Sequence, residues 1–333
     1  MYRNERTRES GRAAICRKVK AYFHLQPESR PTPLLGVQSG WTRGTSRDMG
    51  NGSGGELCLK LPRSTPGGRS KGCAWRFGTS GYRYGVRVLR GDRMSQTSSI
   101  EWTNSTWNPV TGCTKVSQGC KHCYAQRFAE RWRGIPGHPF EQGFELRLWP
   151  ERLDLPLQWK EPRRVFVNSM SDLYHERVPT EFIKRVFATM VSARQHTFQV
   201  LTKRAKRLSG LAPMLTWRPN IWQGVSIERM DVAWRANELR RVPADVRFLS
   251  LEPLLGPLDE LDLSGIQWVI VGGESGPGAR PMKREWVRTL RDRCKKEAVP
   301  FFFKQWGGPQ KSRTGRVLDG RTWDLMPPLA TTV

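Results

Sequence analysis

Residues 165–202 read VFVNSMSDLYHERVPTEFIKRVFATMVSARQHTFQVLT. This stretch begins and ends with the short apolar segments Val165–Asn168 and Phe198–Thr202, which are typical of buried strands. Between them, Thr180–Ala193 carries apolar side chains such as Phe182 and Val186 at the three- to four-residue spacing of one helix face. A strand, a helix and a second strand in this order predict a parallel pair, because parallel strands need a long crossover connection.

The same strand-then-helix rhythm continues through the C-terminal two thirds of the chain. The predicted strands are short and apolar on both faces: Val165–Asn168, Phe198–Thr202, Ile221–Val225, Arg247–Leu251, Trp268–Val271 and Pro300–Lys304. The predicted helices have one apolar stripe each: Tyr124–Arg133, Thr180–Ala193, Ala205–Leu215, Asp231–Arg241 and Lys283–Glu297. This pattern predicts an α/β fold, either a full or partial (β/α) barrel with parallel strands or, as the second choice, an open doubly wound sheet.

Residues 1–93 lack this patterning, and they carry 19 Lys and Arg against 6 Asp and Glu. Their three cysteines, Cys16, Cys58 and Cys73, have no ligand spacing. We therefore expect residues 1–93 to be a disordered basic extension, or a spurious one upstream of a true start at Met94, and residues 94–333 to form the barrel-like domain. The competing interpretation is a basic arm that binds nucleic acid.

Composition limits the class of protein. The chain of 333 residues has a formal net charge of +26, which favours a polyanionic partner, with nucleic acid first, although arginine-rich codon usage would give the same excess. There is no apolar run of about 18 residues and no signal-peptide core, so we expect no membrane contact and a cytoplasmic location. Seven cysteines, an odd number, favour a reducing compartment over a disulfide framework.

Three cysteines are clustered with the spacing C-x6-C-x2-C, at Cys113, Cys120 and Cys123. Nearby lysines favour the thiolate form, which binds metal. Three thiolates without a close fourth cysteine suit a [4Fe–4S] cluster that leaves one iron open. A zinc ion completed by His122 or His138 is the alternative, and a metal-free structural role is the third possibility.

Polar residues follow every predicted strand. Because the carboxyl ends of parallel strands meet at one edge of a sheet, these side chains are expected to share one mouth with the cysteine segment. The candidates are Ser169, Asp172, Thr202, Lys203, Glu252, Gly272, Gly273, Glu274 and Lys304. Taken singly, each could equally be a strand cap or a solvated loop residue. His175 is expected to be a solvated loop histidine. Cys294, on the apolar face of its helix, is expected to be a buried core thiol.

Several stretches together resemble a phage-associated, radical-SAM-like three-cysteine family of unknown function. The resemblance covers about residues 98–327 and rests on SIEWTNSTWNPVTGC (residues 99–113), CKHCYA (120–125), FVNSMSDLYH (166–175), QVLTKR (199–204), FLSLEPLLGP (248–257), VGGESGPGARP (271–281) and FKQWGG (303–308). It implies a partial β/α barrel in which the three cysteines bind a [4Fe–4S] cluster and the open iron binds S-adenosylmethionine. It also implies an enzyme that generates a 5′-deoxyadenosyl radical to modify a substrate, with a nucleic acid or another anionic molecule as the candidate.

If this cofactor binds at the shared mouth, His122 and the strand-end residues named above are expected to contact it. Two features differ from the common radical-SAM pattern: the first cysteine gap is six residues rather than three, and His122 stands where an apolar or aromatic residue usually approaches the adenine. The triplet Gly272–Glu274 is similar to a motif for the cofactor's amino group, but it follows a late strand. The rival functions are a zinc-stabilised, non-catalytic nucleic-acid-binding protein and a scaffold that binds a partner protein without turnover.

Overall fold

Short apolar segments form one parallel sheet in the computed structural model, which describes residues 98–328. The expected extension at residues 1–93 lies outside the described residues. The sheet has seven strands, all parallel to their neighbours, and their order follows the chain. In spatial order they are β1 (Ser105–Trp107), β4 (Arg164–Val167), β5 (Thr197–Thr202), β6 (Ile221–Ser226), β7 (Arg247–Leu251), β8 (Trp268–Gly272) and β9 (Phe301–Gln305).

This strand order distinguishes between the two predicted architectures. A doubly wound sheet reverses its strand order at a switch point, whereas here the order never reverses. Within the described residues the edge strands β1 and β9 do not pair with each other, so the barrel is partial rather than closed. The prediction of a partial (β/α) barrel with parallel strands is confirmed.

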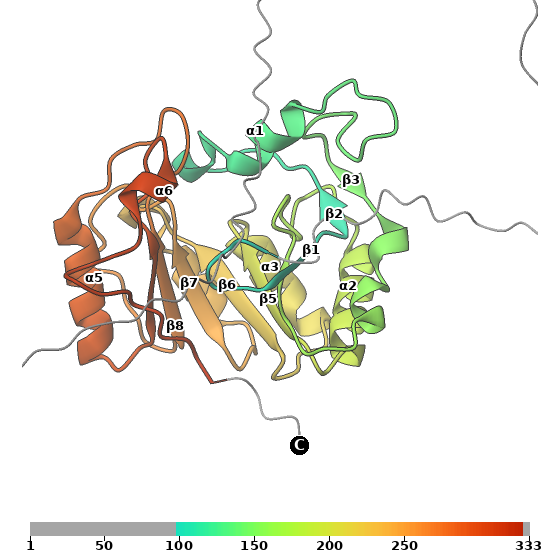
Figure 1. Cartoon of the computed structure of the whole chain (residues 1–333). Coiled ribbons are helices and arrows are strands. Elements are labelled where there is room, and N and C mark those ends of the chain that lie inside the picture. The colour runs from blue at the N-terminus through green and yellow to red at the C-terminus, as the bar shows by residue number, and fades with distance from the viewer. Residues whose placement is uncertain (1–97, 329–333) are drawn as a thin grey trace, which may run out of the picture. The chain divides into compact units, whose positions relative to one another are not determined.

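Helices cover the outer face of the sheet. They are α2 (Thr180–Ser192), α3 (Ala205–Leu211), α4 (Arg235–Arg240) and α5 (Arg284–Lys296). Helix α2 lies beside one end of the sheet and α5 beside the other (Figure 1). Their apolar stripes pack with the outward-facing strand residues, such as Val165, Val200 and Val269, into one large core.

Alternate strand residues point to the inner face, where they form a second core rich in aromatic rings. Its buried members are Trp102, Phe166, Trp222, Phe248, Trp268, Ile270 and Phe302. The ring centroids of Trp102 and Phe166 lie 4.7 Å apart, and those of Trp222 and Trp268 lie 6.0 Å apart. These rings fill the inner face of the partial barrel. The polar residues at the ends of the strands occupy its carboxyl-terminal edge.

All six predicted strands are present within one residue of their expected bounds, but several details differ. The helix expected at 124–133 already ends at Glu130. Strand β1 was not predicted, because three residues are too few to show a pattern. The expected helix at 205–215 stops at Leu211, and a short 3₁₀ turn, η4 (Ala212–Met214), follows it around Pro213. The expected helix at 231–241 begins only at Arg235, after the 3₁₀ turn η5 (Met230–Val232).

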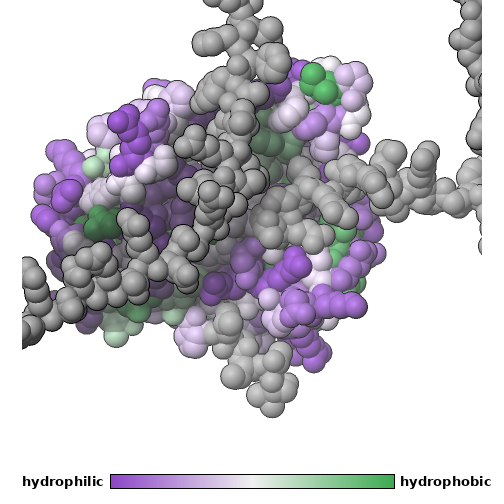
Figure 2. Space-filling view, in the orientation of Figure 1, coloured by the Kyte–Doolittle hydropathy of each residue, from purple (hydrophilic) through white to green (hydrophobic). Residues whose placement is uncertain are grey.

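Two smaller features complete the description. A two-stranded antiparallel sheet joins β2 (Val110–Thr111) to β3 (Arg147–Leu148). The visible face of the described part is mostly hydrophilic, and its hydrophobic side chains form small, separate patches (Figure 2). Among residues 98–328, no helix is both long enough and apolar enough to cross a membrane.

Candidate functional site

The cysteine segment lies over the edge of the sheet at which the parallel strands end. Cys113 follows β2, Cys120 ends the 3₁₀ turn η1 (Gln118–Cys120), and Cys123 caps helix α1 (Tyr124–Glu130). Gly112 bridges in parallel to Ser171, just beyond the end of β4, which anchors the start of the segment at this edge. Helix α1 accordingly lies above the sheet (Figure 1).

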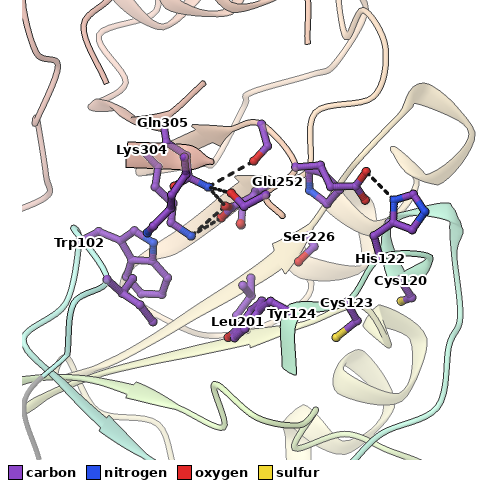
Figure 3. A pocket seen from close by; sticks show the side chains of 18 of the residues that line it. Trp102, Cys120, His122, Cys123, Tyr124, Leu201, Ser226, Glu252, Lys304 and Gln305 are labelled. Atoms are coloured by element: carbon purple, nitrogen blue, oxygen red, sulfur yellow. Dashed lines mark hydrogen bonds and ion pairs between the residues drawn. The ribbon is translucent and has the colours of Figure 1, made fainter. Parts of the chain in front are cut away.

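A cavity of about 400 Å³ opens between this segment and the inner face of the sheet (Figure 3). Its walls combine three kinds of residue. The cysteine segment contributes Cys120, His122, Cys123 and Tyr124. The strand ends contribute Lys203, Ser226, Ser250, Glu252, Gly273, Glu274, Lys304 and Gln305. Apolar side chains, among them Trp102, Phe166 and Leu201, form the remaining wall. A cavity with an apolar wall and a few convergent polar groups is the usual form of a small-molecule site.

One wall of the cavity is held by an ion pair between Glu252 and Lys304. Nζ of Lys304 lies 2.8 Å from both carboxylate oxygens, and Nε2 of Gln305 donates to Oε1 of Glu252 at 3.4 Å. Two buried polar atoms beside this pair have no hydrogen-bond partner within the described residues: Nε1 of Trp102 and Oε1 of Gln305. Since buried polar groups are normally paired, hydrogen bonding in this wall is incomplete within the described residues.

Glu274 ties the cysteine segment to the end of β8. Nδ1 of His122 lies 3.0 Å from its Oε2, and Arg280 donates to the same carboxylate from its backbone N–H and its guanidinium. Burial acts to raise the pKa of Glu274, but the hydrogen bonds from Arg280 and His122 outweigh it and lower the pKa to about 2. Glu274 is therefore ionised and fully engaged by protein groups.

Glu228 makes a second connection, from the end of β6. Oγ of Ser117 donates to its Oε1 at 2.7 Å, and Nη1 of Arg235 donates to its Oε2 at 2.9 Å. The loop passes so close that a Cβ on Gly119 would stand 2.2 Å from Oε1 of Glu228. Only glycine fits at this position, which lies between Cys113 and Cys120.

Arg204 makes the third connection, at Cys113. Its guanidinium donates to the backbone O of Thr114 at 3.1 Å, to Oδ2 of Asp172 at 3.2 Å and to Glu176. It also donates to Sγ of Cys113. Burial first, and then the carboxylate of Asp172, raises the pKa of Cys113 to about 11, although Arg204 acts in the opposite direction.

The structure brings together most, but not all, of the residues that the sequence nominated. Cys113, Ser169, Asp172, Thr202 and Gly272 do not line the cavity, whereas the other nominated residues do. Asp172 is buried and connects the loop after β4 to the end of β5, because it accepts hydrogen bonds from the hydroxyl of Thr202 and the backbone N–H of Lys203. Whether any of the nominated residues contacts a cofactor stays a prediction.

The expectation for His175 is wrong, since its side chain is buried rather than solvated. Nε2 of His175 lies 2.9 Å from Oγ1 of Thr114, and its Nδ1 accepts from the backbone N–H of Arg177. The ring is thus a structural support beneath the first cysteine. The expectation for Cys294 is confirmed, because its side chain is fully buried in the core.

The three cysteines are the donors that a metal centre at this site would use. Among residues 98–328, no three His, Cys, Asp or Glu side chains lie close enough to hold one metal ion. A structural zinc site needs its ligands around one point, so no ready-made zinc site is present in this part of the chain. In a [4Fe–4S] cluster each cysteine binds a different iron. Cys113, Cys120 and Cys123 are free and partly exposed, and two of them face the cavity, which suits such a cluster.

A family model described as "Protein of unknown function (DUF5131)" matches residues 97–327. The chain belongs to this family. No curated protein matches the chain significantly in sequence. The DUF5131 chain is similar to "Spore photoproduct lyase complexed with dinucleoside spore photoproduct", with 14% identity, a TM-score of 0.41, 61% of this chain covered and 65% of that one. It is also similar to a cysteine-to-serine mutant of spore photoproduct lyase, with 15% identity, a TM-score of 0.41, 63% of this chain covered and 65% of that one. The chain thus spans a little under two thirds of these proteins.

Sequence reasoning missed the residues that hold the DUF5131 cysteine segment in place. Arg204, Glu228 and Arg280 each connect this segment to a strand end or to the loop that follows it, across 90 to 162 positions of sequence. The only local signal was the position of Arg204 and Glu228 just after predicted strands, and it does not say which distant group each one binds.

Proposed function

We propose that this chain is a radical-SAM-like iron–sulfur enzyme in which Cys113, Cys120 and Cys123 hold a [4Fe–4S] cluster and S-adenosylmethionine binds in the adjoining cavity. One observation carries the proposal: two of the three cysteines and polar groups from the ends of five neighbouring strands line a single cavity. Parallel β/α enzymes place their chemistry at this edge. The free thiols fit a reducing compartment such as the cytoplasm.

The cavity walls offer suitable partners for such a cofactor. When bound, the cluster and S-adenosylmethionine would supply a 5′-deoxyadenosyl radical that takes a hydrogen atom from a substrate. Lys203, Lys304 and Glu252 present the charges that an amino-acid carboxylate and ammonium group need. The apolar wall at Trp102 and Phe166 limits access of water to that end of the cavity.

The substrate is proposed to be anionic, with nucleic acid as the first candidate. Residues 98–328 carry 37 Lys and Arg against 24 Asp and Glu, so the part of the chain that contains the cavity is itself basic. Association with a partner protein, which the sequence also allows, is compatible with this proposal.

Anaerobic reconstitution of the full chain with iron and sulfide tests the proposal. We expect a brown protein with about four irons per chain. With a reductant and S-adenosylmethionine, it should release 5′-deoxyadenosine. Replacing Cys113, Cys120 and Cys123 together with alanine should abolish both the iron and the product.

The matched control is Cys294→Ala, which removes a cysteine that is buried in the core and does not line the cavity. This variant should keep the full iron content. A colourless protein that carries one zinc per chain, lost in the triple variant, would overturn the enzyme proposal and leave the zinc-stabilised binding protein as the function.

A further inference from the structure

Helix α1 exposes its large aromatic side chains, whereas a helix usually buries such side chains. Tyr124, Phe128 and Trp132 follow one another at intervals of four residues, beginning at the start of α1 and ending in the turn after it. They are 52%, 42% and 38% exposed, respectively. The residues that α1 buries instead are the small Ala125 and Ala129. Exposed large aromatic side chains in a row mark an interaction surface more often than a structural face. We call Tyr124, Phe128 and Trp132 the aromatic stripe.

Two rings of the aromatic stripe, those of Phe128 and Trp132, contact each other and further aromatic rings. The ring centroids of Phe128 and Trp132 lie 6.3 Å apart. His138, from the loop after α1, stacks on Trp132 with centroids 4.2 Å apart and an angle of 13° between the ring planes. The edge of Phe140, which is buried, supports Phe128 from below at 5.8 Å. The stripe is therefore held in place by neighbours.

Cations occur along the same stretch of chain as the aromatic stripe. Lys115, Lys121 and Arg131 are exposed, and none of them has a carboxylate partner within the described residues. Among the described residues, the side chain of Arg127 donates only to the backbone carbonyls of Ser275 and Pro277, so no acid in this part of the chain neutralises its charge. Exposed rings with unpaired cations beside them are the two elements of a single-strand binding surface, because bases stack on the rings and phosphates contact the cations.

The aromatic stripe leads to the cavity, since Tyr124 both belongs to the stripe and lines the cavity wall. We propose that the aromatic stripe and the cations of the same stretch of chain bind single-stranded nucleic acid and present one nucleotide to the cavity. This inference rests on the proposed function for what happens inside the cavity, but the binding surface itself lies outside it. A partner protein would bury the same rings without needing phosphates to pair with the cations.

A binding titration on the full chain tests this inference. The probes are fluorescein-labelled single strands of about 12 nucleotides, one of DNA and one of RNA, and a DNA duplex of the same length, followed by fluorescence anisotropy. The double variant F128A/W132A should weaken single-strand binding by at least about tenfold, because stacking on both rings is lost. The double variant K121M/R131M should reduce the salt dependence, lowering the slope of log K against log salt by roughly 1.4 for two phosphate contacts.

Trp234→Ala is the matched control. Trp234 is 39% exposed, about as much as Trp132 at 38%, and Nζ of Lys206 lies 5.3 Å from its ring, but it stands at the start of α4 rather than on α1. Its replacement should leave single-strand binding within about twofold of wild type. Circular dichroism of each variant shows whether it is folded.

Two outcomes would overturn the inference. One is unchanged single-strand binding in folded F128A/W132A, which is also the result expected if the stripe binds a protein partner instead. The other is a loss of single-strand affinity in W234A as large as that in F128A/W132A. The inference and the proposed function fail separately. A wild-type protein that holds iron and cleaves S-adenosylmethionine but binds no oligonucleotide would refute only the binding surface. Stripe-dependent binding by a protein that never takes up iron would refute only the enzyme.

Discussion

The guanidinium of Arg204 donates a hydrogen bond to Sγ of Cys113, with Nη1 and Sγ 3.4 Å apart. The two residues are 91 positions apart in the chain, and Arg204 stands just beyond the end of β5. Through Arg204, the first cysteine of the segment is tied directly to the edge of the parallel sheet. Hydrogen bonds to the sulfurs of an iron–sulfur cluster are one of the factors that set its reduction potential.

Replacing Arg204 with methionine should destabilise the protein even without metal. The side chains of Arg204 and Asp172 are only 4% and 8% exposed, so the substitution would leave a buried carboxylate without its cation. We expect R204M to lower the free energy of unfolding by on the order of 3 kcal/mol. Urea unfolding of the metal-free protein measures the change.

Arg241→Met is the control for this prediction, since Arg241, whose side chain is 70% exposed, pairs with Glu238 on α4. Such a pair should contribute less than about 1 kcal/mol. If R204M and R241M lost equal stability, Arg204 would not be an anchor of the cysteine segment.

The sequence predicted the fold well because the fold depends on local patterns. Each of the six predicted strands is buried except for at most one half-buried residue, and an apolar run of four to six residues carries that information by itself. The three residues of β1 carry no such signal, and only their pairing with β4 makes them a strand.

The candidate site was only partly predictable, and the reason is physical. The polar residues after each strand could be located, because the carboxyl ends of parallel strands share an edge. Their partners could not be predicted, because a hydrogen bond such as Ser117–Glu228 joins residues 111 positions apart and depends on the tertiary fold. For the same reason Asp172 was expected at the cavity, whereas in the structure it binds Thr202 and Arg204.

Gly119 should not tolerate a side chain. A Cβ there would stand 2.2 Å from Oε1 of Glu228, and Ser117 and Arg235 hold that carboxylate so that it cannot move away. We expect G119A to cost about 1–3 kcal/mol of stability, as overpacking does, and to reduce the iron taken up on reconstitution. Chemical unfolding and iron analysis give the two readouts.

Gly210→Ala provides the comparison for Gly119, because Gly210 lies in helix α3 and a Cβ there meets no atom within 4 Å. Alanine in place of this helical glycine should stabilise the protein by roughly 0.5–1 kcal/mol. Equal effects of the two substitutions would show that the loop is not packed against Glu228.

The link between Glu274 and the cysteine segment should depend on pH. The pKa of Glu274 in the folded protein is about 2, below its ordinary value of 4.5, so the ionised carboxylate stabilises the fold above pH 4.5. That contribution is lost as the pH falls from 4.5 towards about 2. We expect E274Q to be less stable than wild type near neutral pH, with a difference that shrinks through this interval. Urea unfolding at a series of pH values measures it.

Glu181→Gln is the reference for the pH series, since Glu181 is an exposed residue of α2 whose only described ion pair is with Lys184. Its substitution should change stability little at any pH. A stability difference for E274Q that stays constant down to about pH 3 would contradict the low pKa of Glu274.

Lys304 provides a test of the cavity that is separate from the cluster. Its Nζ contacts both oxygens of Glu252, and neither residue touches the cysteine segment through a described hydrogen bond. Lys304→Met should leave the iron content unchanged and weaken S-adenosylmethionine binding by at least about tenfold, which corresponds to about 1.4 kcal/mol. The physical reason is that the variant removes a cation and leaves Glu252 to repel the carboxylate of the ligand. Equilibrium dialysis on the anaerobic, iron-loaded protein measures the affinity.

Two further variants decide what the ion pair does. Lys184→Met, which removes an exposed lysine of α2, should bind S-adenosylmethionine like wild type. The double variant E252Q/K304M should recover part of the affinity lost in K304M, because the unpaired carboxylate is gone while the cavity keeps its shape. Wild-type affinity in K304M would mean that the Glu252–Lys304 pair only closes the wall and that the cofactor is held by other residues.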